Sequence, residues 1–324
     1  MKLSKIPIIP TNGEIQSEPL PAALRRRIAK GEFGASARVE GDPTIYHLPD
    51  SISEAKHVLE FSRNAGEDIN DPEYEKFVSS IGRINSVLGQ YIQSVEQVFQ
   101  FDSDPLRERL DILAENNKGK GFDLTSEFIT PSVLYTVNQL SGLKVTDDYI
   151  NNEQSDIYAL IENAKSHEDG VIPLVSYIGN RLTEEESIWA IRLFIEVAYR
   201  PLSNFISFTA LRMIEEGTAF RSAQKEISAR DIFKKVCSID APTYPGLFRS
   251  SNSGEQFLVP TSWEGTTQNF TFGYGSHSCP GRGFSYMVFE GFFRLLQTTE
   301  LTIKQVEYSA HLPYRILSLR VRPR

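Results

Sequence analysis

Apolar residues recur three and four positions apart along most of the chain after residue 50, which is the period of an amphipathic α-helix. The longest apolar stretch begins with a capping-box pattern, Thr183 followed by Glu186, and stays apolar for several turns. Such a helix is typical of the core of a large domain. The pattern as a whole predicts helices over 53–63, 72–99, 105–116, 128–140, 153–165, 183–216, 221–237 and 282–297.

Strand patterns are short and lie late in the chain, at 257–260 and within 301–322. Residues 1–50 are rich in proline and glycine, which predicts irregular structure. The sequence contains no internal repeat. We therefore expect a mainly α fold with a small β portion, arranged as a single domain over residues 1–324.

The composition is typical of a soluble globular protein, with 40% hydrophobic and 23% charged residues. A net charge of -8 argues against nucleic acid as a partner. Two cysteines provide no disulfide framework, which favours a reducing compartment. The apolar patch in residues 1–10 is too short and too interrupted by proline to be a signal or a membrane anchor. We expect a cytoplasmic protein that binds neither nucleic acid nor a membrane.

One loop carries distinctive chemistry, the segment 272–281 with the sequence Phe-Gly-Tyr-Gly-Ser-His-Ser-Cys-Pro-Gly. Pro280 stands where the first residue of the following helix is expected, because its missing N–H costs nothing there. The positive end of that helix favours a Cys279 thiolate, and a thiolate binds iron. Gly275 and Gly281 allow the backbone to approach a flat ligand. The loop therefore predicts a haem-thiolate site.

The loop resembles that of the cytochrome P-450 superfamily, Phe-x-x-Gly-x-x-x-Cys-x-Gly with a histidine two places before the cysteine. The matching residues are Phe272, Gly275, His277, Cys279 and Gly281. The resemblance implies an abbreviated P-450-like fold, haem b (iron protoporphyrin IX) as cofactor, Cys279 as the iron ligand and the other four residues as haem contacts. The alternative is a buried structural cysteine beside a chance glycine turn. The other cysteine, Cys237, has no glycine loop around it, and we expect it to be a small core residue.

The resemblance extends patchily over residues 71–324 and implies further haem contacts. Arg249, in a segment similar to the family's propionate-binding strand, and His277 are expected to contact the haem propionates. Tyr74 stands where the family usually has a histidine, and it is either a propionate donor or an ordinary residue of an amphipathic helix. His277 has the alternative of facing solvent. The family's Glu-x-x-Arg pair is missing before Cys279, and Asp231 with Lys234 keeps its charges and spacing.

The middle of the long helix departs from the family pattern. The family carries an acid and a threonine there for proton delivery, but residues 197–204 contain neither. Arg200 and Pro201 occupy the place instead, and Pro201 predicts a helix kink. An Arg-Pro pair here resembles the fatty-acid peroxygenase branch, in which the arginine holds the substrate carboxylate over the iron and hydrogen peroxide supplies the oxygen. This implies catalytic roles for Arg200 and Pro201.

A structural alternative for Arg200 stays open, because Arg192, Glu196 and Arg200 are four residues apart. That spacing also fits a charged ladder on one face of a helix.

The resemblance implies an oxidative enzyme, a monooxygenase or peroxygenase of specialised metabolism. Its substrate would be small or bound to a carrier protein and would bear a carboxylate. A ferredoxin-type electron donor is implied if dioxygen, not peroxide, is the oxidant. Two alternatives remain: a haem enzyme that catalyses a rearrangement, dehydration or isomerisation, and a haem protein without catalytic activity.

Overall fold

The computed structural model describes residues 8–9, 27, 32–64, 72–146, 149, 157–162, 164, 172–215, 229–239, 246–251, 253–261, 269–275, 278–308 and 315–323. The chain forms two compact units. Unit 1 comprises residues 1–68, 231–279 and 306–317. Unit 2 comprises residues 69–230, 280–305 and 318–324.

Unit 1 is built on a six-stranded sheet of short strands, in the order β1-β2-β3-β7-β6-β4. The antiparallel pair β6 and β7 is its longest ladder, with Leu247 opposite Val259 and Arg249 opposite Phe257. β3 runs parallel to β7, although the two are far apart in the sequence. The strands are β1 (Ile8–Ile9), β2 (Ser36–Val39), β3 (Tyr46–His47), β4 (Arg63–Asn64), β6 (Leu247–Ser250) and β7 (Gln256–Val259).

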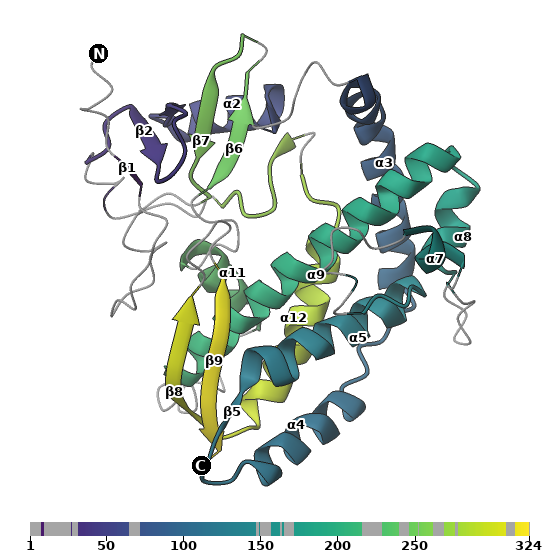
Figure 1. Cartoon of the computed structure of the whole chain (residues 1–324), viewed down its shortest axis with the longest axis vertical. Coiled ribbons are helices and arrows are strands. Elements are labelled where there is room, and N and C mark those ends of the chain that lie inside the picture. The colour runs from purple at the N-terminus through teal and green to yellow at the C-terminus, as the bar shows by residue number, and fades with distance from the viewer. Residues whose placement is uncertain are drawn as a thin grey trace. The chain divides into compact units, whose positions relative to one another are not determined.

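Helix α2 (Ile52–Phe61) packs against β7 and closes the core of unit 1 (Figure 1). Its start is set locally, because Ser51 accepts a hydrogen bond from the Glu54 N–H at 3.2 Å. The Glu54 carboxylate in turn accepts from the Asp50 N–H at 2.7 Å. The buried face of α2 then covers the sheet with Ala55, Val58 and Leu59. Helix α11 (Ala229–Ile239) also lies largely in unit 1.

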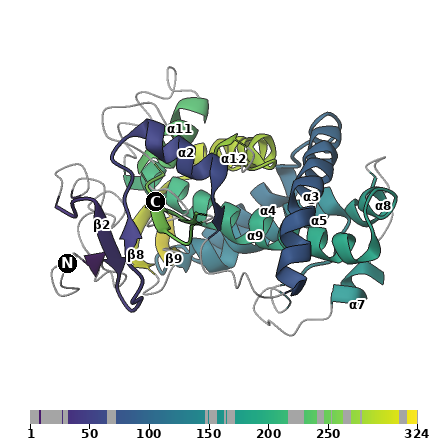
Figure 2. The ribbon, with the colours of Figure 1, turned by 90° about the horizontal axis from the view of Figure 1, so that it is seen from above.

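Unit 2 is helical and is arranged around α9, which contacts α3, α5, α8, α12 and the π-helix η2 (Figures 1 and 2). Every residue of α9 from Leu202 to Leu211 is buried. None of the helices in the described part of the chain is long and apolar enough to cross a membrane. The helices of unit 2 whose bounds are described are α3 (Pro72–Glu96), α4 (Asp104–Asn116), η2 (Leu124–Ile129), α5 (Thr130–Ser141), α7 (Ile157–Glu162), α8 (Leu174–Gly179), α9 (Glu184–Glu215) and α12 (Arg282–Gln297).

Aromatic rings fill the space between the helices of unit 2. Phe205 of α9 lies 5.6 Å from Phe289 of α12, measured between ring centroids. Phe128 of η2 lies 6.1 Å from Phe292 of α12. The hydroxyl of Tyr91 on α3 donates to the Leu140 carbonyl at 2.7 Å, which satisfies a buried polar group and ties α3 to α5.

A three-stranded sheet has the order β5-β9-β8. The Asp123 carboxylate joins it to η2, because it accepts from the Leu319 N–H at 3.1 Å and from the Thr125 N–H at 3.0 Å. The first of these bonds holds β9 and the second caps the π-helix. The strands are β5 (Phe122–Asp123), β8 (Leu301–Tyr308) and β9 (Ile316–Pro323).

The expectation of a mainly α fold with a small β portion is confirmed. The predicted bounds of α2, α3, α4, α9 and α12 agree with the structure to within a few residues. The segment 128–140 begins earlier than predicted, as the π-helix η2. Within the predicted helix 153–165, the structure describes α7. Within the predicted helix 221–237, it describes α11, and residues 221–228 lie outside the described residues.

The expectation of irregular structure throughout residues 1–50 was wrong, because this segment contributes β1, β2 and β3 to the sheet of unit 1. The short helix α8 was also not predicted. Strands of two to four residues are too short to show a period in the sequence. Their hydrogen-bond partners, such as Phe257 opposite His47, are supplied from far along the chain.

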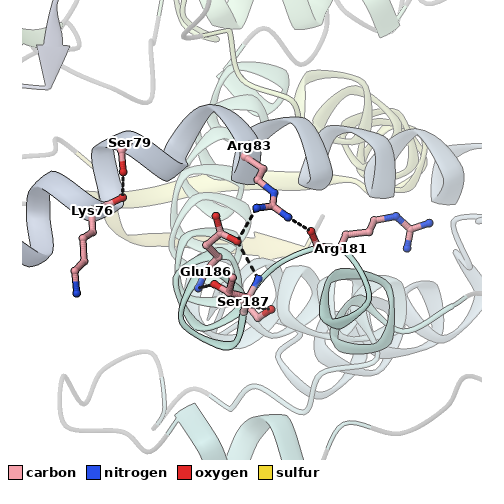
Figure 3. A network of polar contacts seen from close by, with 7 residues as sticks. Lys76, Ser79, Arg83, Arg181, Glu186 and Ser187 are labelled. Carbon is pink, nitrogen blue, oxygen red and sulfur yellow. Dashed lines mark hydrogen bonds and ion pairs between the residues drawn. The ribbon is translucent and has the colours of Figure 1, made fainter.

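A buried carboxylate fixes the start of α9 (Figure 3). Glu186 accepts from the Thr183 N–H at 2.9 Å, and the Glu186 N–H donates back to the Thr183 hydroxyl at 3.2 Å. This is the predicted capping box. Arg83 of α3 reaches the same carboxylate at 3.5 Å and donates to the Arg181 carbonyl at 2.7 Å. The pKa of Glu186 is lowered, mainly by the hydrogen bond from the Thr183 N–H and also by the positive charge of Arg83.

We expect Glu186→Gln to lower the free energy of unfolding near pH 7 by about 1 kcal/mol, because the amide is a weaker partner for the Thr183 N–H. A lowered pKa in the folded state means that the charged form stabilises the fold above the pKa of the unfolded chain. That contribution is lost as the pH falls through the folded-state pKa. The difference between variant and wild type, measured by denaturant unfolding, should therefore shrink as the pH falls below the usual pKa range of a glutamate.

Glu184→Gln is the matched control, since Glu184 lies in the same first turn and is exposed. We expect it to change the free energy of unfolding by no more than about 0.5 kcal/mol. A Glu186→Gln effect that stays constant with pH would contradict a role for the Glu186 charge.

Candidate functional site

The cysteine loop of unit 1 is closed by three backbone hydrogen bonds. The Cys279 N–H donates to the Phe272 carbonyl at 2.7 Å, the Ser278 N–H to the Gly275 carbonyl at 3.1 Å, and the Gly273 N–H to the Phe270 carbonyl at 2.8 Å. Gly273 and Gly275 have φ of 70° and 59°, in the left-handed region that glycine adopts without strain. Cys279 is held at the end of this turn and is partly exposed.

Helix α2 supports the loop from one side. Phe270 is buried with Ala55, Val58 and Leu59. The Lys56 ammonium lies 5.3 Å from the centroid of the Tyr274 ring, a cation–π contact. A Cβ at Gly275 would lie 3.3 Å from Glu60 Cγ, so crowding by α2 is a second reason for glycine at 275. The sequence shows that α2 has an apolar face but not that this face packs against the loop.

Helix α11 supports the loop through two further contacts. The Phe233 ring stacks on Phe272 with centroids 5.7 Å apart and planes 11° apart. The Thr271 hydroxyl donates to the Cys237 carbonyl at 3.2 Å. Cys237 is 4% exposed, as expected of a structural core residue. Phe272, predicted as a haem contact, therefore has a packing role as well.

The same helix carries the two residues proposed to replace the Glu-x-x-Arg pair. Lys234 is exposed, and the side chain of Asp231 lies outside the described part of the structure. Their role stays a prediction.

Arg249 lies in β6, whose neighbour Leu247 packs on the core that also holds Phe270. The strand and the cysteine loop are thus joined through one hydrophobic core. Arg249 is 8% exposed, and its Nη1 donates to the Phe248 carbonyl at 2.8 Å. A buried guanidinium is a strong donor group for a carboxylate such as a haem propionate.

The side chains of the other two propionate candidates lie outside the described part of the structure. His277 lies outside the described residues. The backbone at Tyr74 belongs to α3, but its side chain is outside the described part.

In unit 2, helix α12 begins shortly after the cysteine, at Arg282. Gly281 is the N-cap of α12, and its carbonyl accepts from the Ser285 N–H at 2.8 Å. Pro280 therefore precedes the N-cap, and the prediction that it is the first helical residue was wrong. The predicted helix over 282–297 is confirmed as α12. Cys279 is thus three residues before the start of a helix.

Arg200 and Pro201 lie in α9, directly before its continuously buried stretch. Arg200 is exposed, and the fully buried stretch begins at Leu202. Val197, which shares a helix face with both residues, is 48% exposed. Arg192 and Glu196 are also exposed, so the face that they share with Arg200 is compatible with the charged ladder.

The donor set indicates the kind of metal group that fits. Within the described residues, no cluster of three or more His, Cys, Asp or Glu side chains is arranged to hold a metal ion. A lone, loop-held cysteine supplies one ligand, which suits an iron whose other ligands come from a macrocycle. The buried Arg249 of strand β6 is a suitable partner for the carboxylates of such a macrocycle.

The chain matches no protein-family model, and it matches no curated protein in sequence. Solved structures do match. CYP105N1 from Streptomyces coelicolor A3(2) is 14% identical with a TM-score of 0.69, over 97% of this chain and 99% of the other. Cytochrome P450 CYP109Q5 from Chondromyces apiculatus is 13% identical with a TM-score of 0.67, over 98% of both chains.

P450BioI, in complex with acyl carrier protein ligated to hexadec-9Z-enoic acid, is 14% identical with a TM-score of 0.67, over 94% of this chain and 98% of that one. These similarities cover nearly the whole of each chain and agree with the motif of the cysteine loop. The chain has the cytochrome P450 fold.

Proposed function

We propose that this protein is a haem-thiolate oxidoreductase with haem b as cofactor and Cys279 as the iron ligand. The observation that carries the proposal is the cysteine loop, in which left-handed glycines and the Cys279-to-Phe272 hydrogen bond hold one partly exposed cysteine within a cytochrome P450 fold. The thiolate-ligated iron, when bound, supplies the cleavage of an O–O bond. Arg249, His277 and Tyr74 are the proposed propionate contacts, and Phe272, Gly275 and Gly281 the proposed contacts of the haem loop.

The proposed substrate class is a carboxylic acid with an apolar part. Arg200 would bind the carboxylate through a charge-assisted pair, and Val197 and Pro201 would meet the hydrocarbon. The stretch 197–204 offers neither an acid nor a threonine for proton transfer, so a substrate carboxylate near Arg200 would provide the acid–base group. Peroxide is the oxidant that needs no electron donor. With dioxygen, a ferredoxin-type donor would be required.

A carrier-bound substrate in specialised metabolism is a second form of the same proposal. The structural similarity to P450BioI, which was solved with an acyl carrier protein, supports it. A thioester uses up the carboxyl group that forms it. A carrier-bound substrate would therefore need a second carboxylate in order to bind Arg200, which makes the free acid the simpler substrate.

Cys279→Ala should abolish the thiolate-haem signature, because Cys237 is buried in α11 and its backbone is engaged by Thr271. The measurement is the absorption spectrum of the reduced protein under carbon monoxide, in which a thiolate ligand shifts the Soret band strongly to the red. Cys237→Ala is the matched control and should keep the shifted band. A band that survives in Cys279→Ala would disprove the assignment of the iron ligand.

Arg200→Ala should raise the dissociation constant of carboxylic acids about ten- to hundredfold, because a hydrogen-bonded charge pair contributes about 1.5–3 kcal/mol. The methyl esters of the same acids should bind equally to variant and wild type. Binding is measured by spectral titration of the haem protein, and acid-dependent peroxide consumption is followed in parallel. Arg192→Ala, two helical turns away on the same exposed face, is the control and should change neither quantity.

Equal effects of Arg200→Ala and Arg192→Ala would favour the charged ladder over the carboxylate anchor. Haem binding with no peroxide consumption by any acid would instead favour an enzyme of rearrangement, dehydration or isomerisation, or a haem protein without catalytic activity.

A further inference from the structure

Two positions on one face of α3 lie against the segment that directly follows Cys279. Gly89 and Glu96 are seven residues apart, which is close to two helical turns. A Cβ at Gly89 would lie 3.4 Å from Pro280 Cβ. A Cβ at Gly283 would lie 2.9 Å from Glu96 Cδ, so the carboxyl group occupies the space that a side chain at 283 would need. Helix α3 thus holds both ends of the short link from Pro280 into α12.

The Glu96 carboxylate caps the first turn of α12. It accepts a hydrogen bond from the Phe284 N–H, one of the donors that a helix leaves unpaired at its start. The side chain is only partly exposed, and burial raises the pKa of Glu96 while the Phe284 N–H acts in the opposite direction. Gly281, the N-cap residue, provides no side-chain cap of its own. The side chain of Glu96, which belongs to α3, provides the cap instead.

The position of this carboxylate matters for the cysteine. Gly283 is four residues after Cys279, so their Cα atoms cannot be more than about 14 Å apart. The positive end of α12 stabilises negative charge near it, including a thiolate on Cys279. A carboxylate at the same helix end offsets part of that positive potential. The thiolate then keeps more electron density to donate.

We propose that Glu96 is a positioning residue for the Cys279 ligand: its carboxylate fixes the first turn of α12 and, by its charge, lowers the reduction potential of the bound haem iron. This inference rests on the proposed haem-thiolate function. This arrangement also requires Gly283, since the absence of a side chain there leaves room for the Glu96 carboxylate.

The test is Glu96→Gln in the haem-loaded protein, with the ferric/ferrous midpoint potential measured by spectroelectrochemical titration. The amide oxygen can still accept from the Phe284 N–H, so we expect the same thermal unfolding temperature and a midpoint potential shifted in the positive direction. Glu290→Gln is the matched control, because Glu290 is an acidic residue of the same helix that pairs with Arg294 away from its start. Its shift should be clearly smaller.

A second variant tests the geometry. Gly283→Ala should displace the carboxylate and also shift the potential in the positive direction. In the double variant with Glu96→Gln the two shifts should not add, because both remove the same interaction. Additive shifts would overturn the pairing of Glu96 with Gly283.

The outcomes separate this inference from the proposed function. If the reduced wild-type protein under carbon monoxide lacks the red-shifted band, the proposed function and this inference fall together. If the band is present in wild type and Glu96→Gln but the potential moves no more than in Glu290→Gln, only the role of Glu96 is overturned.

Discussion

The complete burial of α9 from Leu202 to Leu211 is the constraint on which the arrangement of unit 2 depends. A helix that is buried on all sides must pack against several other elements, and α9 packs against α3, α5, α8, α12 and η2. The hydroxyls inside the buried stretch are satisfied within the protein, since Ser207 donates to the Ser203 carbonyl and Thr209 to the Phe205 carbonyl. The start of the helix is fixed separately, by the Glu186 capping box and Arg83.

The same constraint explains why Arg200 is notable. A guanidinium is costly to bury, and Arg200 stands at the last exposed position before the buried stretch begins. Pro201 follows at once and removes one backbone donor.

The cysteine loop in unit 1 depends on support from elements far away in the sequence. Its hydrogen bonds and left-handed glycines are local, but Phe270 is anchored by α2 and Phe272 by α11. In unit 2, the link after Cys279 is held in the same manner by Gly89 and Glu96 of α3. The position of Cys279 therefore depends on the packing of its neighbours.

The sequence by itself determined the approximate bounds of α2, α3, α4, α9 and α12, the capping box at Thr183 and the motif of the cysteine loop. Each depends on residues within a few positions of one another, through helical period, side-chain caps or glycine conformation. Only the tertiary structure decided the short strands within residues 1–50, the exposure of Arg200, the stacking of Phe233 on Phe272 and the meeting of Glu96 with Gly283. These contacts join residues distant in the chain, and no local pattern encodes which distant side chain will fill a given space.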